Sequence, residues 1–270
     1  MNVPKFCRIA VVVEDIDAFM ADCSTLLGIE HIRPSLDAAY DSFTVMFGEH
    51  GLEPIQPHGE VAFTKDGRLI EVAIDVADAE KTREGLKAGG YEPATISYLP
   101  GPDKNEYLYG REFHGLPLMV CTAGDNEAQM RVQGPFAALD DAPLPKIGCV
   151  SVVVEDLDKT VADMKKYFGM TFVDTDPAGL GARAMVGPHR VKLVEKPSAA
   201  VAALEPPLAA IEFVYDDVEP VRARIEAAGH PVLHTRTFSN GDKAYFFGSL
   251  IQDMPVAIYP VSADSEVIGA

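Results

Sequence analysis

The 7 histidines and 4 cysteines of this sequence show neither the HxH nor the CxxC spacing that is common in metal sites. Structural zinc sites and disulfide frameworks usually show such spacing. We therefore expect most histidines to lie in loops or at the surface. We expect free thiols, as in a reducing cytoplasm, for Cys7, Cys23, Cys121 and Cys149.

The carboxylate of Glu212 is the strongest single candidate for acid–base chemistry. It lies in the largely apolar run from Ala210 to Tyr215, which favours a strand. A buried carboxylate is costly unless it is paired. Glu212 is therefore predicted either to act as an acid or base, or to form an ordinary buried pair with an arginine or a lysine.

Two further pairs of polar side chains stand at strand spacing. His234 and Arg236 are two residues apart on a predicted strand, so both side chains share one face. Tyr107 and Tyr109 alternate with an apolar residue and could offer phenolic donors to a bound ring. We predict that these residues bind substrate.

The elements that position these side chains follow from an internal repeat. The segment that begins at Arg8, RIAVVVEDID, returns at Cys149 as CVSVVVEDLD. The β-branched residues predict a strand, and an aspartate that can cap a helix follows in each copy. Apolar residues at helical spacing then lead to Gly28 and Gly169, which favour a helix end.

A second strand–helix pattern lies inside each half. Residues 71–78 lead into a helix that ends near residue 90, and residues 210–217 lead into one that ends near residue 229. Short strand-like runs follow each helix. Such periodicity predicts an α+β fold of four βαβββ modules in two paired domains. The predicted boundaries are residues 1–123 and 146–270, with a linker rich in Ala, Asp, Gly and Pro at 124–145.

The charge balance excludes several classes of partner. The chain has 23 Lys and Arg against 41 Asp and Glu, a net charge of −18. Nucleic acids and anionic membranes require a cationic surface, so neither is expected as a partner. No signal-like or membrane-spanning run occurs in the 270 residues, so we expect a cytoplasmic protein. Either a monomer or a homodimer is compatible with the sequence.

The strand, Val-Glu-Asp turn, helix and Leu-Gly or Phe-Gly ending, repeated at domain scale, resemble the vicinal oxygen chelate superfamily. This superfamily includes glyoxalase I, fosfomycin and bleomycin resistance proteins, and extradiol dioxygenases. The resemblance covers nearly the whole chain, and it implies four modules whose pairs form cups. Members usually hold a divalent metal in a cup, with ligands from the first strand of each module and a glutamate on a last strand.

The resemblance assigns those ligand positions to residues that suit a metal poorly. In the first domain they fall on Arg8, Glu71 and Met119, and in the second on Cys149, Ala210 and Ala257. A guanidinium has no acceptor lone pair and repels a cation, and alanine cannot bind a metal. We therefore expect a protein with no metal and no other cofactor.

The same positions suggest other roles. Arg8 could hold a substrate carboxylate or enolate with Glu71 as a general base, or the two could form a structural ion pair that closes an unused cavity. Since a nearby arginine lowers the pKa of a base, the structural alternative is favoured. Cys149 and Ser151 share a strand face and are predicted to line the pocket of the second cup.

Three functions remain open on this basis. The first is a metal-independent glyoxalase-like lyase or isomerase that acts on a small aromatic or oxo compound through Glu212, Glu71 and Arg8. The second is a small-molecule binding or sequestration protein of the bleomycin-resistance type. The third is an extradiol dioxygenase-like enzyme with a non-standard metal site. The superfamily fold by itself does not decide among them.

Overall fold

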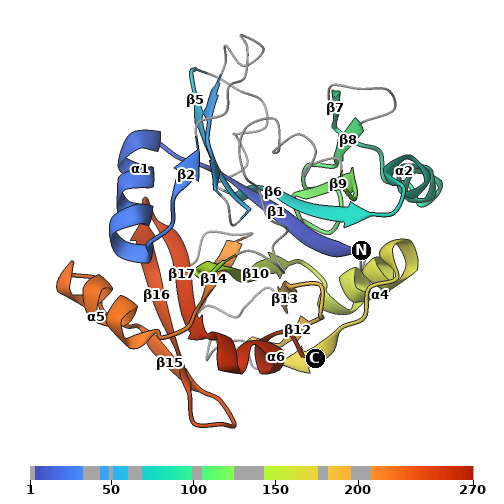
Figure 1. Ribbon diagram of the computed structural model, residues 1–270. Helices are drawn as coiled ribbons and strands as arrows, with labels where there is room; N and C mark the ends of the chain where they lie inside the picture. Colours follow the sequence, from blue (N-terminus) through green and yellow to red (C-terminus); the bar gives the residue numbers. More distant parts are fainter. Residues whose placement is uncertain are drawn as a thin grey trace.

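The computed structural model describes residues 4–32, 43–48, 51–59, 69–98, 105–124, 143–175, 182–195 and 208–269. Most of the predicted linker, residues 125–142, lies outside the described residues. Two curled mixed sheets dominate the structure, one above the other in Figure 1. Among the described residues, no helix is both long and apolar enough to cross a membrane.

The first sheet has 7 strands in the order β3-β5-β1-β6-β9-β8-β7. Its two central strands are antiparallel, and each has a parallel neighbour on its other side. A separate two-stranded sheet pairs β2 with β4. The bounds are β1 Lys5–Val12, β2 His31–Ile32, β3 Phe43–Val45, β4 Phe47–Gly48, β5 Leu52–Pro57, β6 Leu69–Val76, β7 Thr95–Tyr98, β8 Asn105–Leu108 and β9 Leu118–Thr122.

The second sheet repeats this plan with 8 strands in the order β11-β12-β13-β10-β14-β17-β16-β15. Again the central pair is antiparallel, with a parallel strand on each side. The bounds are β10 Lys146–Val154, β11 Val173–Thr175, β12 Ala184–Val186, β13 Val191–Glu195, β14 Leu208–Tyr215, β15 His234–Thr237, β16 Lys243–Ile251 and β17 Met254–Pro260. The predicted α+β fold of βαβββ modules in two paired domains is confirmed.

Each module carries its helix directly after its first strand, as the repeat predicts. Asp15, Asp78 and Asp156 each accept a hydrogen bond from a backbone amide three residues later, at 2.9–3.0 Å. Gly28 and Gly169 end their helices in the left-handed conformation. The helices are α1 Ile16–Asp22, continued by the π-helix η1 Cys23–Leu27, then α2 Ala79–Ala88, α4 Leu157–Phe168, α5 Glu219–Ala227, the short η3 Val261–Ala263 and α6 Asp264–Val267.

One hydrophobic cluster joins the two domains. It includes inward side chains of both sheets and of all four module helices, for example Phe6, Leu86, Val150 and Phe213. The helices meet across the domains: α5 lies beside η1, and α2 lies beside α4 (Figure 1). The Tyr215 hydroxyl donates to the Leu27 carbonyl at 2.8 Å. The opposite face of each sheet is therefore free to carry polar side chains.

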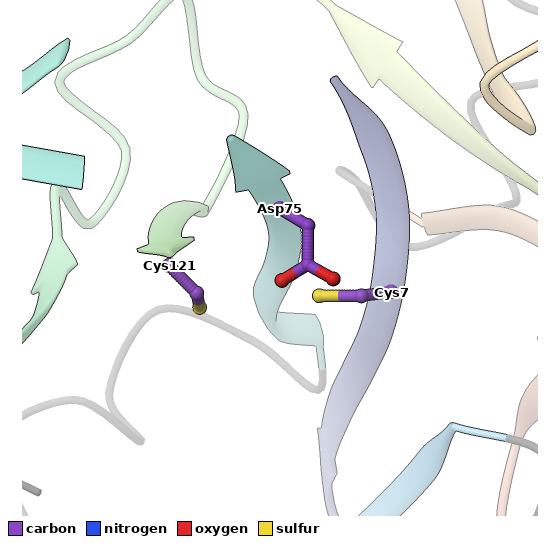
Figure 2. Close-up of side chains that lie close together, drawn as sticks. All are labelled: Cys7, Asp75 and Cys121. Atoms are coloured by element: carbon purple, nitrogen blue, oxygen red, sulfur yellow. The ribbon is translucent and has the colours of Figure 1, made fainter. Parts of the chain in front are cut away.

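These opposite faces form the two cups. The first cup carries Arg8, Glu53, Glu71 and Glu106, and the second carries Ser151, Lys192 and Glu212. A register shift between Phe6 and Arg8 on β1 marks a bulge at Cys7. Cys7 consequently packs with Cys121 on the same side of the sheet as Arg8, and Figure 2 shows both thiols beside Asp75.

Candidate functional site: two cups of opposite design

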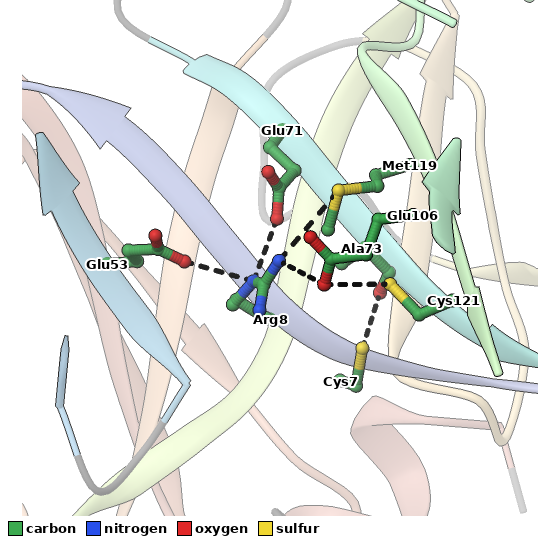
Figure 3. A network of polar contacts seen from close by, with 8 residues as sticks. All are labelled: Cys7, Arg8, Glu53, Glu71, Ala73, Glu106, Met119 and Cys121. Carbon is green, nitrogen blue, oxygen red and sulfur yellow. Dashed lines mark hydrogen bonds and ion pairs between the residues drawn. The ribbon is translucent and has the colours of Figure 1, made fainter. Parts of the chain in front are cut away.

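The first cup holds a guanidinium among three carboxylates (Figure 3). Arg8 Nε lies 2.9 Å from Glu71 Oε1 and 3.0 Å from Glu53 Oε2, and Arg8 Nη2 lies 3.0 Å from Glu106 Oε1. All four residues are buried. Met119 Sδ lies 3.8 Å from Arg8 Nη2, so the side chain at the assigned last-strand position contacts the same guanidinium.

The electrostatics of this cluster reflect its burial and its excess of carboxylates. Burial would lower the pKa of Arg8, but Glu71, Glu106 and Glu53 together raise it well above its ordinary value. Burial raises the pKa of Glu53 to about 8 although Arg8 lowers it, and burial likewise raises the pKa of Glu71. The first cup therefore contains a permanent internal cation and at least one carboxyl group that binds a proton near neutral pH.

Glu53 and Glu106 did not emerge from the sequence. Glu53 lies on β5, whose sequence LEPIQP contains two prolines and argues against a strand. Glu106 is the neighbour of Tyr107 on β8, so strand alternation could have placed it on the cup face opposite to that tyrosine.

The residues at the assigned ligand positions of the first cup do not fit a divalent metal. The cationic Arg8 group occupies the place between Glu71 and Met119 and already binds the carboxylates. In the second cup the assigned positions are Cys149, Ala210 and Ala257, which offer one buried thiol and two methyl groups. In neither cup do the residues at the assigned positions form a ligand set for the divalent metals that the superfamily usually binds.

The second cup contains a buried lysine–glutamate pair. Lys192 Nζ on β13 lies 2.5 Å from Glu212 Oε1 on β14, and the Ser151 hydroxyl donates to the same oxygen at 2.5 Å. Burial would lower the pKa of Lys192, but Glu212 more than offsets this and the pKa is raised. Glu212 thus faces the cup as the strand alternation predicted, paired with a lysine that stays charged.

A pocket opens over this pair. The pocket is small: the volume in which a water molecule can be centred is about 20 Å³. Its polar lining consists of Lys192, Glu212, His234 and Arg236. The remaining wall is mainly apolar and aromatic and comprises Phe238, Ala244, Tyr245, Phe246, Ala257 and Val267.

Arg236 is held in position at the side of this pocket. Its guanidinium lies over the Phe238 ring, 4.8 Å from the ring centre, and Nη2 lies 3.4 Å from Glu266 Oε1. His234 stands two residues before Arg236 on the edge strand β15 and lines the same pocket. The pocket therefore brings together three of the predicted residues, His234, Arg236 and Glu212.

Cys149 and Ser151 lie beneath this pocket on β10. Cys149 is the cross-strand partner of Glu212, and Ser151 that of Ala210. Burial and the nearby Glu212 raise the pKa of Cys149 well above its ordinary value, so the thiol is not a reactive thiolate. Ser151 orients Glu212, and neither side chain belongs to the pocket lining.

Tyr107 and Tyr109 do not lie in either cup, contrary to the sequence-based expectation. Both side chains belong to the core between sheet and helices. The Tyr107 hydroxyl donates to Glu80 on α2, and its ring lies under the guanidinium of Arg83. Alternation along β8 turns Glu106 toward the cup and Tyr107 away from it, the reverse of the arrangement that substrate binding by Tyr107 would need.

Comparison with known proteins links this fold to a family. Residues 146–254 match the Glyoxalase/Bleomycin resistance protein/Dioxygenase superfamily. No curated protein sequence matches the chain.

Three solved structures illustrate the structural similarity. The Mn(II)-bound glyoxalase from Novosphingobium aromaticivorans has a TM-score of 0.65 at 16% identity, covering 96% of this chain and 82% of that one. The 2,2',3-trihydroxybiphenyl 1,2-dioxygenase from Sphingomonas wittichii strain RW1 has a TM-score of 0.67 at 12% identity, covering 96% and 91%. A mutant 4-hydroxymandelate synthase from Streptomyces coelicolor has a TM-score of 0.65 at 14% identity, covering 96% and 93%. At these identities the similarity establishes the shared fold.

Proposed function

We propose that the second cup binds and converts a small aromatic or oxo compound. Residues 146–254, which form most of this cup, match the Glyoxalase/Bleomycin resistance protein/Dioxygenase superfamily, and the whole chain shares its fold with a glyoxalase. The reaction is a lyase or isomerase step that uses a carboxylate and cationic side chains in place of a metal. The observation that carries this proposal is the pocket above the Lys192–Glu212 pair.

The lining of the pocket favours an anionic ligand with an apolar body. Arg236 and Lys192 are cationic, whereas Phe238 and Phe246 offer aromatic surface. A guanidinium oriented by its neighbours binds a carboxylate through two parallel hydrogen bonds. A small α-oxo acid with an aromatic substituent has both features.

The proposed chemistry is proton transfer next to a carbonyl group. Glu212 removes a proton from the carbon beside the carbonyl, and the electron pair moves onto the carbonyl oxygen as an enolate. The Lys192 ammonium stabilises that developing negative charge in a buried environment. Glu212 then returns the proton to another carbon, in an isomerase, or to a leaving group, in a lyase. Ser151 keeps the carboxylate oriented through its hydrogen bond.

A binding protein is the second candidate, and one observation favours it. Glu212 is already paired with Lys192 at 2.5 Å. The same carboxylate oxygen also accepts from Ser151, so it is engaged twice before any substrate binds. Sequestration of a small anionic aromatic compound, as by a resistance protein, would need the pocket but no proton transfer. The extradiol dioxygenase alternative is not proposed, because Cys149, Ala210 and Ala257 cannot supply two imidazoles and a carboxylate.

Phenylpyruvate in deuterated water is a suitable probe for both candidates. We expect metal-stripped wild-type protein to accelerate loss of the benzylic proton signals, measured by NMR. Glu212→Gln should slow this exchange by roughly 100-fold or more, as for removal of a general base. Glu71→Gln makes the same chemical change in the first cup and should leave the rate unaltered.

The possible results separate the two functions. Binding of phenylpyruvate without accelerated exchange would support sequestration. Exchange that survives in Glu212→Gln but disappears in Glu71→Gln would contradict the assignment to the second cup.

The proposal also includes a cellular compartment, a partner and an oligomeric state. All four cysteines are free thiols, which supports a reducing compartment such as the cytoplasm. The partner that we propose is the small-molecule ligand, and we propose no binding to nucleic acid or to a membrane. The protein acts as a monomer or as a homodimer.

A further inference from the structure

A second group of polar side chains lies in the first cup, beside the arginine cluster. Cys7 on β1, Asp75 on β6 and Cys121 on β9 come from three adjacent strands (Figure 2). Their sulfur and carboxylate oxygen atoms all lie within 4.8 Å of one another. Asp75 and Cys121 are buried, and Cys7 is partly buried. Within the described residues, no other set of three or more metal-binding side chains comes as close together.

The bulge at Cys7 creates this arrangement. Phe6 pairs with Ile74 and Arg8 pairs with Ala73, so Cys7 is the extra residue of β1. Its thiol donates to the Ala73 carbonyl at 3.4 Å and packs near Cys121. Without the bulge, strand alternation would turn Cys7 and Arg8 to opposite faces.

The second domain shows what fills this space when no ligand-type residues are present. By strand register, Gly148, Val214 and Tyr259 correspond to Cys7, Asp75 and Cys121. A Cβ atom on Gly148 would collide with the side chains of both Val214 and Tyr259. Ordinary packing therefore closes this place in the second cup, whereas the first cup has two thiols and a carboxylate there.

The charge of the first cup also favours an added cation. Four carboxylates lie on this sheet, those of Asp75, Glu53, Glu71 and Glu106. Arg8 is the cation among the three glutamates. Lys5 is the cross-strand partner of Asp75. A buried excess of carboxylates is unfavourable unless protons or further cations offset it.

A disulfide between the two cysteines is not compatible with the sheet. Strand β6 separates β1 from β9. Neighbouring strands lie about 4.8 Å apart, which puts the two cysteine backbones roughly 10 Å apart. A disulfide requires Cα atoms within about 7 Å of each other. A metal ion can bridge the longer gap, because each thiol contributes its own bond.

We propose that Cys7, Asp75 and Cys121 form a site for a thiophilic divalent cation of the zinc type. Two thiolates and a carboxylate are three of the four ligands that a tetrahedral zinc site needs. Glu106, whose Oε1 lies 3.8 Å from Cys121 Sγ, or a water molecule completes the set. Binding releases the two thiol protons to solvent. The site differs from the superfamily's ligand positions at Arg8, Glu71 and Met119, and it is independent of the function proposed for the second cup.

Cobalt(II) is the probe for this site, because thiolate-bound Co²⁺ absorbs in the near ultraviolet. We expect the full-length chain to bind one Co²⁺ with a charge-transfer band, and Zn²⁺ to remove that band by competition. Cys7→Ser and Cys121→Ser should each abolish or strongly reduce it. Asp75→Asn should weaken Co²⁺ binding by roughly tenfold or more, since even outer ligand partners contribute that much.

Two control variants and one label-based measurement make the test decisive. Cys23→Ala removes a buried thiol elsewhere, and Glu71→Gln alters a superfamily position; both should retain the band. If a cysteine variant does not fold, alkylation of the wild-type protein replaces it: Zn²⁺ should slow the modification of Cys7, the partly buried ligand. The proposal is overturned if saturating Co²⁺ gives no thiolate band, if the band survives both serine variants, or if Zn²⁺ does not protect Cys7.

Discussion

At the scale of single residues, Arg8 determines the character of the first cup. Its guanidinium binds Glu53, Glu71 and Glu106 in a buried cluster. The sequence identified Arg8 and Glu71 as a pair and favoured a structural ion pair over a catalytic one. The additional carboxylates strengthen that structural interpretation. Because they already bind the Arg8 guanidinium, a substrate carboxylate would have to displace them.

Replacement of Arg8 by methionine should therefore destabilise the protein severely. The variant leaves buried carboxylates without their counter-charge, and loss of one partner of a buried pair costs about 3–5 kcal/mol. Denaturant unfolding at neutral pH measures the change. The double variant Arg8→Met with Glu71→Gln should recover part of the loss. A destabilisation below about 1 kcal/mol would show that the cluster is not tightly coupled.

The same cluster predicts a pH dependence of stability. The pKa of Glu53 is raised to about 8 in the folded protein, mainly by burial. The folded state thus holds a proton that the unfolded state loses near its ordinary pKa of about 4.3. Stability should fall as pH rises between these values, because the unfolded state releases the proton more readily. In chelator-treated protein, Glu53→Gln should flatten this slope; an unchanged slope would contradict the assignment.

At the scale of helices and strands, the sequence predicted those features that depend on neighbouring residues in the chain. The capping aspartates, the left-handed glycines and the module repeat are all present as expected. The face of a strand is harder to predict, because one bulge or one misjudged strand end reverses it. Glu106 and Tyr107 are the example, since the tyrosine was expected in the cup and the glutamate occupies it. The bulge at Cys7 likewise depends on pairing with β6, which lies far along the chain.

The capping role of Asp156 gives a prediction at this scale. Its carboxylate accepts a hydrogen bond from the Lys159 amide at 3.0 Å at the start of α4. Asp156→Ala should lower the free energy of unfolding by about 1 kcal/mol. Asp156→Asn preserves the acceptor and serves as the matched control in denaturant unfolding. Equal losses in both variants would assign the effect to charge instead of capping.

At the scale of the whole molecule, the two domains share one hydrophobic cluster. Polar contacts also cross between them. Gln252 accepts from the Glu14 amide at 2.7 Å, and Tyr91 donates to Asp163 at 2.8 Å. We expect one calorimetric unfolding transition with equal calorimetric and van't Hoff enthalpies. Two separated transitions would mean that the domains unfold independently.

The whole molecule also explains why the two cups differ. Lys192 occupies on β13 the register position that Glu53 has on β5, and Ala210 corresponds to Glu71. One cup is therefore occupied by its own arginine, whereas the other opens as a pocket lined by Lys192 and Arg236. The two sheets thus share their strand arrangement but carry different side chains at matching positions.

The most direct test of this division is calorimetric titration of metal-stripped protein with phenylpyruvate. Arg236→Gln, in the second cup, should weaken binding by roughly tenfold, as expected for a lost hydrogen bond to a charged group. Glu71→Gln, in the first cup, should bind like the wild type. If Glu71→Gln loses binding while Arg236→Gln keeps it, the ligand site lies in the first cup and the proposed division between the cups is wrong.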